Sequence, residues 1–123
     1  MDRRSGRRRR QLTPLAPRVK VWLETDGRYS FGFGITRILQ AVDNAGSIKQ
    51  AALDLGLSYR YVWGRIKKAE EALGRQLVEA QVGGAGTQRS SLTLEARRLL
   101  SAFLAFRSRM QQLLRDEYAR HFD

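Results

Sequence analysis

Two adjacent helical segments, each opened by a serine and closed by a glycine, constrain this chain more than any other feature of its sequence. Ser47 and Ser58 stand at expected N-caps, and Gly56 and Gly74 stand where a helix ends in the left-handed conformation. Gln50 follows Ser47 at the spacing of a capping box. These segments predict a helix-turn-helix, with a short helix from Ser47 to Gly56 and a longer one from Ser58 to Gly74.

The longer helix has an apolar side and a basic side. At about 100° per residue, its apolar residues fall together and predict the side that faces the core: Val62, Ile66, Ala69 and Leu73. On the opposite side we expect Arg60, Gly64, Lys67, Lys68 and Glu71, with Tyr61 close by and Arg65 as a further positive charge. This side of the helix could bind an acidic partner, and the usual alternative is a surface of mixed charge that only contacts solvent. However, Gly64 costs about 1 kcal/mol relative to alanine in mid-helix, and it would let the backbone approach another surface closely.

A β-hairpin and a further helix are predicted before this pair. Apolar residues alternate from Val19 to Glu24, and Asp26-Gly27 is a hairpin turn signal, so the returning strand is expected from Arg28 to Phe33. The next helix is predicted by an apolar stripe at helical spacing, and Gly46 ends it. The stripe consists of Ile35, Ile38, Leu39 and Val42.

A second hairpin and a long helix follow. Residues 77–81 and 90–92 predict short strands around a glycine-rich loop with Arg89 at its far end, as in a DNA-binding wing. Thr93 is placed to cap a last helix from Leu94 to about Arg120. Its apolar residues form a coiled-coil-like seam: Ala96, Leu99, Phe103, Phe106, Met110 and Leu113. We expect this seam to pair with a second copy, because a rise of about 1.5 Å per residue carries its far end beyond one small core.

The order of these elements predicts the fold class. It is mainly α with small β-hairpins: a winged helix-turn-helix with an N-terminal β-hairpin and a long C-terminal dimerisation helix. Residues 1–18 are expected to form a disordered basic arm. We expect residues 19–93 to form a winged helix-turn-helix DNA-binding domain with its N-terminal hairpin, and residues 94–123 to form the long helix.

The balance of charges predicts a polyanionic partner. The chain of 123 residues carries a net charge of +11, and its first ten residues hold six arginines and one aspartate. Subtracting the +5 of those ten residues leaves +6, so the rest of the chain is basic as well. Proteins this basic most often bind nucleic acid. The basic arm has two possible roles: it binds phosphates, or it only makes the chain more soluble.

Cysteine and histidine, which serve in many catalytic and zinc sites, are nearly absent. There is no cysteine, and His121 is the only histidine, so nucleophile–histidine catalysis and zinc sites are not expected. The glycine-rich loop lacks the Lys-Ser/Thr pair of a Walker A motif. We expect no enzyme activity, no metal and no cofactor. No apolar run approaches the ~20 residues of a membrane span, and we expect a cytoplasmic, nucleoid-associated protein with no membrane partner.

Several short motifs carry a family resemblance. They are Gly46-Ser47-Ile48, Ala51-Ala52, Ser58-Tyr59 with Trp63, Leu77-Val78-Glu79, Gly83-Gly84 and Leu92-Thr93. In this order and spacing they resemble the N-terminal winged helix-turn-helix domain of the ModE family of molybdate-responsive regulators, and more distantly the LysR-type regulators. The resemblance covers about residues 19–120, and it implies a recognition helix, a supporting helix and a wing.

The resemblance also implies roles for individual residues. DNA contacts are expected where the recognition helix opens, at Ser58, Tyr59, Arg60 and Tyr61. The supporting helix is expected to touch backbone phosphates through Ser47, Lys49 and Gln50. The wing is expected to approach a neighbouring groove or backbone through residues that include Thr87, Gln88, Arg89 and Ser90. Trp63 matches the family's structural tryptophan and is expected in the core.

We therefore expect a sequence-specific regulator of transcription that binds double-stranded DNA as a homodimer. The dimer is expected to form through Leu99, Phe103, Phe106, Met110 and Leu113. Full ModE regulators carry C-terminal molybdate-binding modules, and because this sequence stops at Asp123 we do not expect it to sense molybdate itself. Two alternatives stay open: a protein-interaction module whose separate partner supplies the effector sensing, and a protein that coats DNA without sequence preference.

Overall fold

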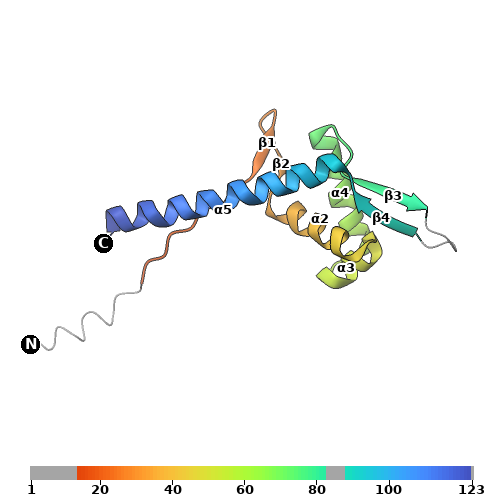
Figure 1. Cartoon of the computed structure of the whole chain (residues 1–123), viewed down its shortest axis with the longest axis horizontal. Coiled ribbons are helices and arrows are strands. Elements are labelled where there is room, and N and C mark those ends of the chain that lie inside the picture. Colours follow the sequence, from red (N-terminus) through yellow and green to blue (C-terminus); the bar gives the residue numbers. More distant parts are fainter. Residues whose placement is uncertain (1–13, 83–87, 123) are drawn as a thin grey trace, which may run out of the picture.

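A computed structural model describes residues 14–82 and 88–122 (Figure 1). The elements follow in the order β1 (Leu23–Thr25), β2 (Arg28–Phe31), α2 (Phe33–Ala45), α3 (Ile48–Leu55), α4 (Tyr59–Leu73), β3 (Val78–Val82), β4 (Gln88–Leu92) and α5 (Leu94–Phe122). β1 pairs with β2 and β3 pairs with β4, both antiparallel, in separate two-stranded sheets. Figure 1 shows the hairpins and shorter helices gathered along the first half of α5, while its second half extends away from them. The predicted fold class, mainly α with small β-hairpins and a long C-terminal helix, is confirmed.

α2 forms the centre of the core. All four residues of its predicted apolar stripe are buried: Ile35, Ile38, Leu39 and Val42. The other helices cover α2 with Ala51 and Ala52 of α3, Val62, Ile66 and Ala69 of α4, and Ala96, Leu100 and Phe103 of α5. The ring of Phe31 in β2 meets the ring of Phe103 edge-on, with their centroids 5.3 Å apart. Each helix thus contributes one face to the core and leaves the other to solvent.

The helix boundaries follow the predicted caps. The hydroxyls of Ser47 and Ser58 each accept a hydrogen bond from the backbone N–H three residues on, at 3.0 and 3.1 Å. Gly56, between α3 and α4, has a φ of +70°, which glycine adopts at little cost. The predicted capping box is half wrong, because the side chain of Gln50 donates to Oδ1 of Asp54 (2.8 Å) instead of turning back to the cap.

The N-terminal hairpin is shorter than predicted. β1 has three residues and β2 has four, and the Asp26-Gly27 turn between them has positive φ at both residues. The returning strand ends at Phe31 instead of Phe33, because Gly32 caps α2. Its carbonyl accepts hydrogen bonds from the backbone N–H (3.0 Å) and the hydroxyl (2.7 Å) of Thr36. The hydrogen bonds that would extend the strand are therefore replaced by those of a helix.

The chain before β1 contacts α5. Residues 19–22, predicted as strand, have no regular secondary structure, and Val21 packs against the core. Farther back, the hydroxyl of Tyr118 donates a hydrogen bond to the carbonyl of Leu15 at 3.3 Å. The contact with α5 therefore starts before residue 18, where the arm was predicted to end. Residues 1–13 of that predicted arm lie outside the described residues.

The long last helix is present, but its apolar seam is divided. α5 is 29 residues long, and the hydroxyl of Thr93 caps it by accepting a hydrogen bond from a first-turn N–H at 3.1 Å. Phe103 is 2% exposed within its own chain, and Leu100, which lies outside the predicted seam, is buried beside it. Phe106 and Leu113 are 47% and 41% exposed. The prediction that Phe103 pairs with a second copy is wrong, because that side chain fills the core against β2.

Candidate nucleic-acid interface

α4 is anchored on one side and exposed on the other. Val62 and Ile66 are buried almost completely in the core. The opposite side exposes Arg60, Lys67 and Glu71, as predicted. A Cβ added at Gly64 would meet nothing within 4 Å. The exposed side of α4 thus combines positive charge with a position where the backbone is open to another surface.

Three aromatic side chains stand near the start of α4. Tyr59, Tyr61 and Trp63 are 48%, 49% and 45% exposed. The prediction that Trp63 lies in the core is wrong, because it follows the buried Val62 by about 100° around the helix and so points along the surface. Nζ of Lys67 lies 5.5 Å from the centroid of the Trp63 ring, in a cation–π contact. The start of α4 therefore offers apolar surface beside its charges.

Arg65 holds Tyr61 in place. Its Nη1 donates a hydrogen bond to the hydroxyl of Tyr61 at 3.0 Å. Its Nη2 lies 3.1 Å from the point where a Cβ on Gly34 would stand, so the guanidinium rests against the first turn of α2. Arg65 is therefore half-buried and turned toward α2, away from the exposed side that carries Arg60. Lys68 is exposed and lines a cleft beside the β1–β2 hairpin.

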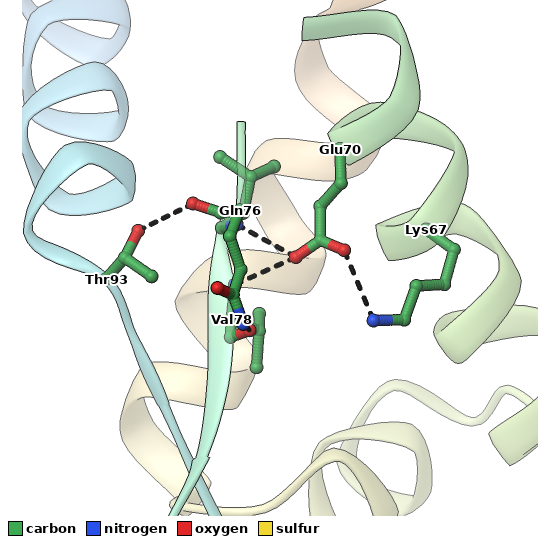
Figure 2. Close-up of polar contacts among 6 residues, drawn as sticks. Lys67, Glu70, Gln76, Val78 and Thr93 are labelled. Carbon is green, nitrogen blue, oxygen red and sulfur yellow. Dashed lines mark hydrogen bonds and ion pairs between the residues drawn. The ribbon is translucent and has the colours of Figure 1, made fainter. Parts of the chain in front are cut away.

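Glu70 ties α4 to the wing, as Figure 2 shows. Its Oε2 accepts hydrogen bonds from the backbone N–H of Leu77 (2.8 Å) and of Val78 (3.2 Å). Its Oε1 lies 3.3 Å from Nζ of Lys67. Sequence reasoning missed this residue. The one available signal was a carboxylate in the last turns of a helix, where the helix dipole disfavours negative charge unless another group compensates it.

Thr93 joins the end of the wing to its beginning. Its hydroxyl donates to the carbonyl of Gln76 at 2.9 Å (Figure 2), and its backbone N–H donates to the carbonyl of Leu77 at 2.9 Å. Between these points β3 and β4 are in continuous register from Val78 opposite Leu92 to Val82 opposite Gln88. The base of the wing is thus fixed to both α4 and α5.

Arg89 reaches the turn between α2 and α3. Its Nη2 lies 3.1 Å from the point where a Cβ on Gly46 would stand. The next residue, Ser90, donates its backbone N–H to the carbonyl of Gly46 at 2.9 Å. Arg89 therefore lies close to Ser47 at the start of α3. Thr87 lies outside the described residues, and Gln88 is described only as the first residue of β4.

The first turn of α3 follows directly on the turn that Arg89 reaches. Lys49 and Gln50 are exposed there, and the hydroxyl of Ser47 is engaged as the helix cap. The structure thus places the arginine of the wing against Gly46, the residue that directly precedes the N-cap of α3. Arg60 and Tyr61 stand apart from them, in the first turn of α4.

Other kinds of site find little support in the described part of the chain. Residues 14–82 and 88–122 contain no group of three or more His, Cys, Asp or Glu residues that could hold a metal ion. Across the same residues no helix combines the length and the apolar character that crossing a bilayer requires.

A small helical core that presents a basic, partly aromatic helix and is followed by a β-hairpin defines the class of winged helix-turn-helix proteins. Within it, the chain belongs to the lysR family of bacterial regulatory helix-turn-helix proteins, whose family model matches residues 35–97. Members of this family are DNA-binding regulators of transcription. The likeness to the LysR-type regulators expected from the sequence is confirmed.

Two curated relatives agree with this assignment. The chain is 33% identical over 67 residues to the transcriptional regulator ModE of Haemophilus influenzae, with 54% of this chain and 26% of the relative covered. It is 31% identical over 77 residues to the molybdenum-pterin-binding protein MopB of Rhodobacter capsulatus, with 63% of this chain and 28% of the relative covered. The chain thus spans about a quarter of the length of either relative.

The fold is shared with solved DNA-binding domains. The CbnR DNA-binding domain, solved in complex with DNA, matches with a TM-score of 0.54 and 22% identity, covering 74% of this chain and all of that one. At this identity the comparison establishes the fold alone.

Proposed function

We propose that the chain is a sequence-specific regulator of transcription that binds double-stranded DNA, with α4 as its recognition helix. The observation that carries this proposal is the first turn of α4, where Arg60 and Tyr61 are exposed on a helix whose opposite side is locked into the core. An α-helix held in this way fits the major groove, and arginine is the side chain that most often reads guanine there.

The other predicted residues take supporting roles in this proposal. Ser58 and Tyr59 begin α4 beside the reading residues, and Gly64 lets the helix backbone approach the groove. Backbone phosphates are contacted by Ser47, Lys49 and Gln50 of α3, by Lys67 of α4, and by residues 87–90 of the wing. Arg89 lies close to the start of α3, so the sugar-phosphate backbone of one DNA strand could contact both. This supports the assignment of phosphate contacts to α3 and the wing.

We propose further that the regulator acts as a homodimer through the second half of α5. A shallow apolar groove of about 480 Å³ runs between residues 19–22 and α5. Phe106, Met110 and Leu113 line it from the helix, and Trp22, which is 44% exposed, lines it from the preceding segment. Apolar surface this concentrated is typical of an interface. A two-fold dimer would place two α4 helices on an inverted-repeat operator, with half-sites about 34 Å or a multiple apart.

Molybdate sensing is not part of this proposal, because the similarity to ModE covers only 26% of that regulator. Contact with a separate effector-sensing protein stays compatible with the proposed dimer.

Selection of binding sites from random duplexes tests the proposal. The selected duplex and a scrambled duplex are then compared by titration with the wild type, Arg60→Ala and Arg89→Ala. Arg60→Ala should lose about 1–3 kcal/mol on the selected duplex, as expected for a two-bond contact with guanine, and much less on the scrambled one. Arg89→Ala should weaken both duplexes equally, as loss of a phosphate contact does. A wild type that binds both duplexes equally well would contradict sequence-specific recognition and support the coating function instead.

A further inference from the structure

A small cavity lies on the side of α4 away from the β3–β4 wing. Its volume is about 200 Å³, roughly that of six or seven water molecules at about 30 Å³ each. Tyr29 and Ser30 of β2 form one wall, and Arg65 and Lys68 of α4 form the other. Its apolar lining comes from Ile35, Ala69 and Ala72. The cavity is therefore large enough for a small anion with a few waters, and it is not filled by side chains.

The charges around this cavity are all positive. No carboxylate lines it, and within the described residues neither Arg65 nor Lys68 forms an ion pair. Some cations of the described chain are paired with a carboxylate, such as Lys67 with Glu70 and Arg97 with Asp43. The first turn of α2, which borders the cavity, has no acidic residue and no side-chain cap, so its partial positive charge adds to the two cations.

Several hydrogen-bond donors at this cavity have no acceptor within the described residues. Arg65 uses Nη1 to hold Tyr61, but a guanidinium carries five N–H donors in all. Lys68 has three donors, and the hydroxyl of Tyr29 supplies one more. The Ser30 hydroxyl already donates to the carbonyl of Leu23 at 3.2 Å. A concentration of positive charge and unused donors favours an oxyanion, and phosphate matches both its charge and its acceptor atoms.

The cavity continues into an open cleft of about 790 Å³, because Tyr29, Lys68 and Ala72 line both. Arg28 lines this cleft, as do the exposed carboxylates of Asp26 and Glu71. Carboxylates repel an anion, so the all-cationic inner cavity is where an anion would be held. Its link to the start of α4 is direct, because Arg65 bonds to Tyr61 in the first turn of that helix.

We propose that this cavity binds a phosphate group, and that in the complex with DNA this group belongs to the DNA backbone. Lys68 and Glu70 lie about 200° apart around α4, at about 100° per residue, so the β1–β2 hairpin and the β3–β4 wing flank the helix on opposite sides. The hairpin then acts as a second wing, and α4 is held between two phosphate contacts. The assignment of the phosphate to DNA rests on the proposed DNA-binding function.

Two variants test the site, and a third variant that loses one positive charge elsewhere in the chain is the control. Lys68→Gln removes a cation from the cavity wall, whereas Ala72→Leu fills the cavity without changing the charge. Arg120→Gln removes the same charge from the far end of α5, away from α4 in Figure 1. The affinity for a random duplex is measured over a series of salt concentrations. Lys68→Gln and Ala72→Leu should each reduce the slope of log K against log salt by about 0.9, the value for one phosphate contact, while Arg120→Gln leaves the slope unchanged.

A second measurement separates the two sources of phosphate. Thermal melting of the chain without DNA is compared in inorganic phosphate and in chloride at equal ionic strength. If inorganic phosphate stabilises the wild type and Ala72→Leu abolishes this stabilisation, the cavity is supported as a site for free phosphate. The change in salt slope is the separate result that assigns the bound phosphate to DNA. If Ala72→Leu alters neither the salt slope nor the response to phosphate, the proposed site is refuted. A wild type that does not bind duplex DNA would refute the proposed function instead, and the melting experiment would still test the cavity.

Discussion

Replacing Glu70 should loosen the wing and destabilise the whole chain. Glu70→Ala leaves two backbone donors without their acceptor, at Leu77 and Val78, which are 0% and 7% exposed. A buried donor left unsatisfied costs about 1–3 kcal/mol, so two of them cost about 2–6. The Glu70 side chain is 13% exposed, so water can replace part of the lost hydrogen bonding. We therefore expect the free energy of unfolding to fall by about 2–4 kcal/mol. That is a large share of the roughly 6–18 kcal/mol expected for a chain of this length.

Urea unfolding followed by circular dichroism, at one protein concentration, measures this loss. Glu71→Ala is the matched control, because the adjacent carboxylate is exposed and forms no hydrogen bond or ion pair within the described residues. It should change stability by less than about 0.5 kcal/mol. Glu70→Gln keeps an oxygen acceptor and should fall between the two. If Glu70→Ala and Glu71→Ala lose the same amount, the carboxylate does not hold the wing and the reasoning from its two hydrogen bonds fails.

Two further predictions concern assembly and the arm. Phe106→Glu should convert the proposed dimer to a folded monomer in sedimentation equilibrium, whereas Phe103→Ala should lose about 3–5 kcal/mol of stability because it empties the core; a wild type that sediments as a monomer at micromolar concentration would refute the dimer. Deleting residues 1–13, which include six arginines, should reduce the salt dependence of DNA binding and leave the preferred site unchanged. An altered site preference at matched salt would mean that the arm reads sequence.

Local signals in the sequence were enough to locate the helices. Ser47, Ser58 and Thr93 all cap the helices that they were predicted to cap, because a cap depends on atoms only three residues apart. The apolar stripe of α2 was predicted for a similar reason, since its period reports which side of a helix is buried. The strands were less predictable. β2 ends early because Gly32 begins a helix, and alternation of side chains does not show where a strand gives way to one.

Contacts between distant parts of the chain could not be predicted from the sequence. The partners of Glu70 lie seven and eight residues on, across a turn whose path the local spacing does not fix. Arg65 and Lys68 were expected with Arg60 among the exposed charges of one helix. Which of them faces solvent and which faces the hairpin depends on how β2 packs against α4, and only the structure gives that packing.

The seam of α5 shows what a periodic pattern leaves undetermined. Phe103 and Phe106 occupy equivalent places in the same apolar repeat, yet one is buried against Phe31 and the other is 47% exposed. Periodicity states that a side of the helix is apolar, but it does not state what covers that side. The core of the chain covers the first part of α5, and residues 19–22 line only an edge of the second part. The apolar seam continues along α5 beyond the part that the core covers, and this is the physical reason to propose that a second copy packs there. The dimer interface should therefore be sought at the exposed half of the seam and not along the whole of it.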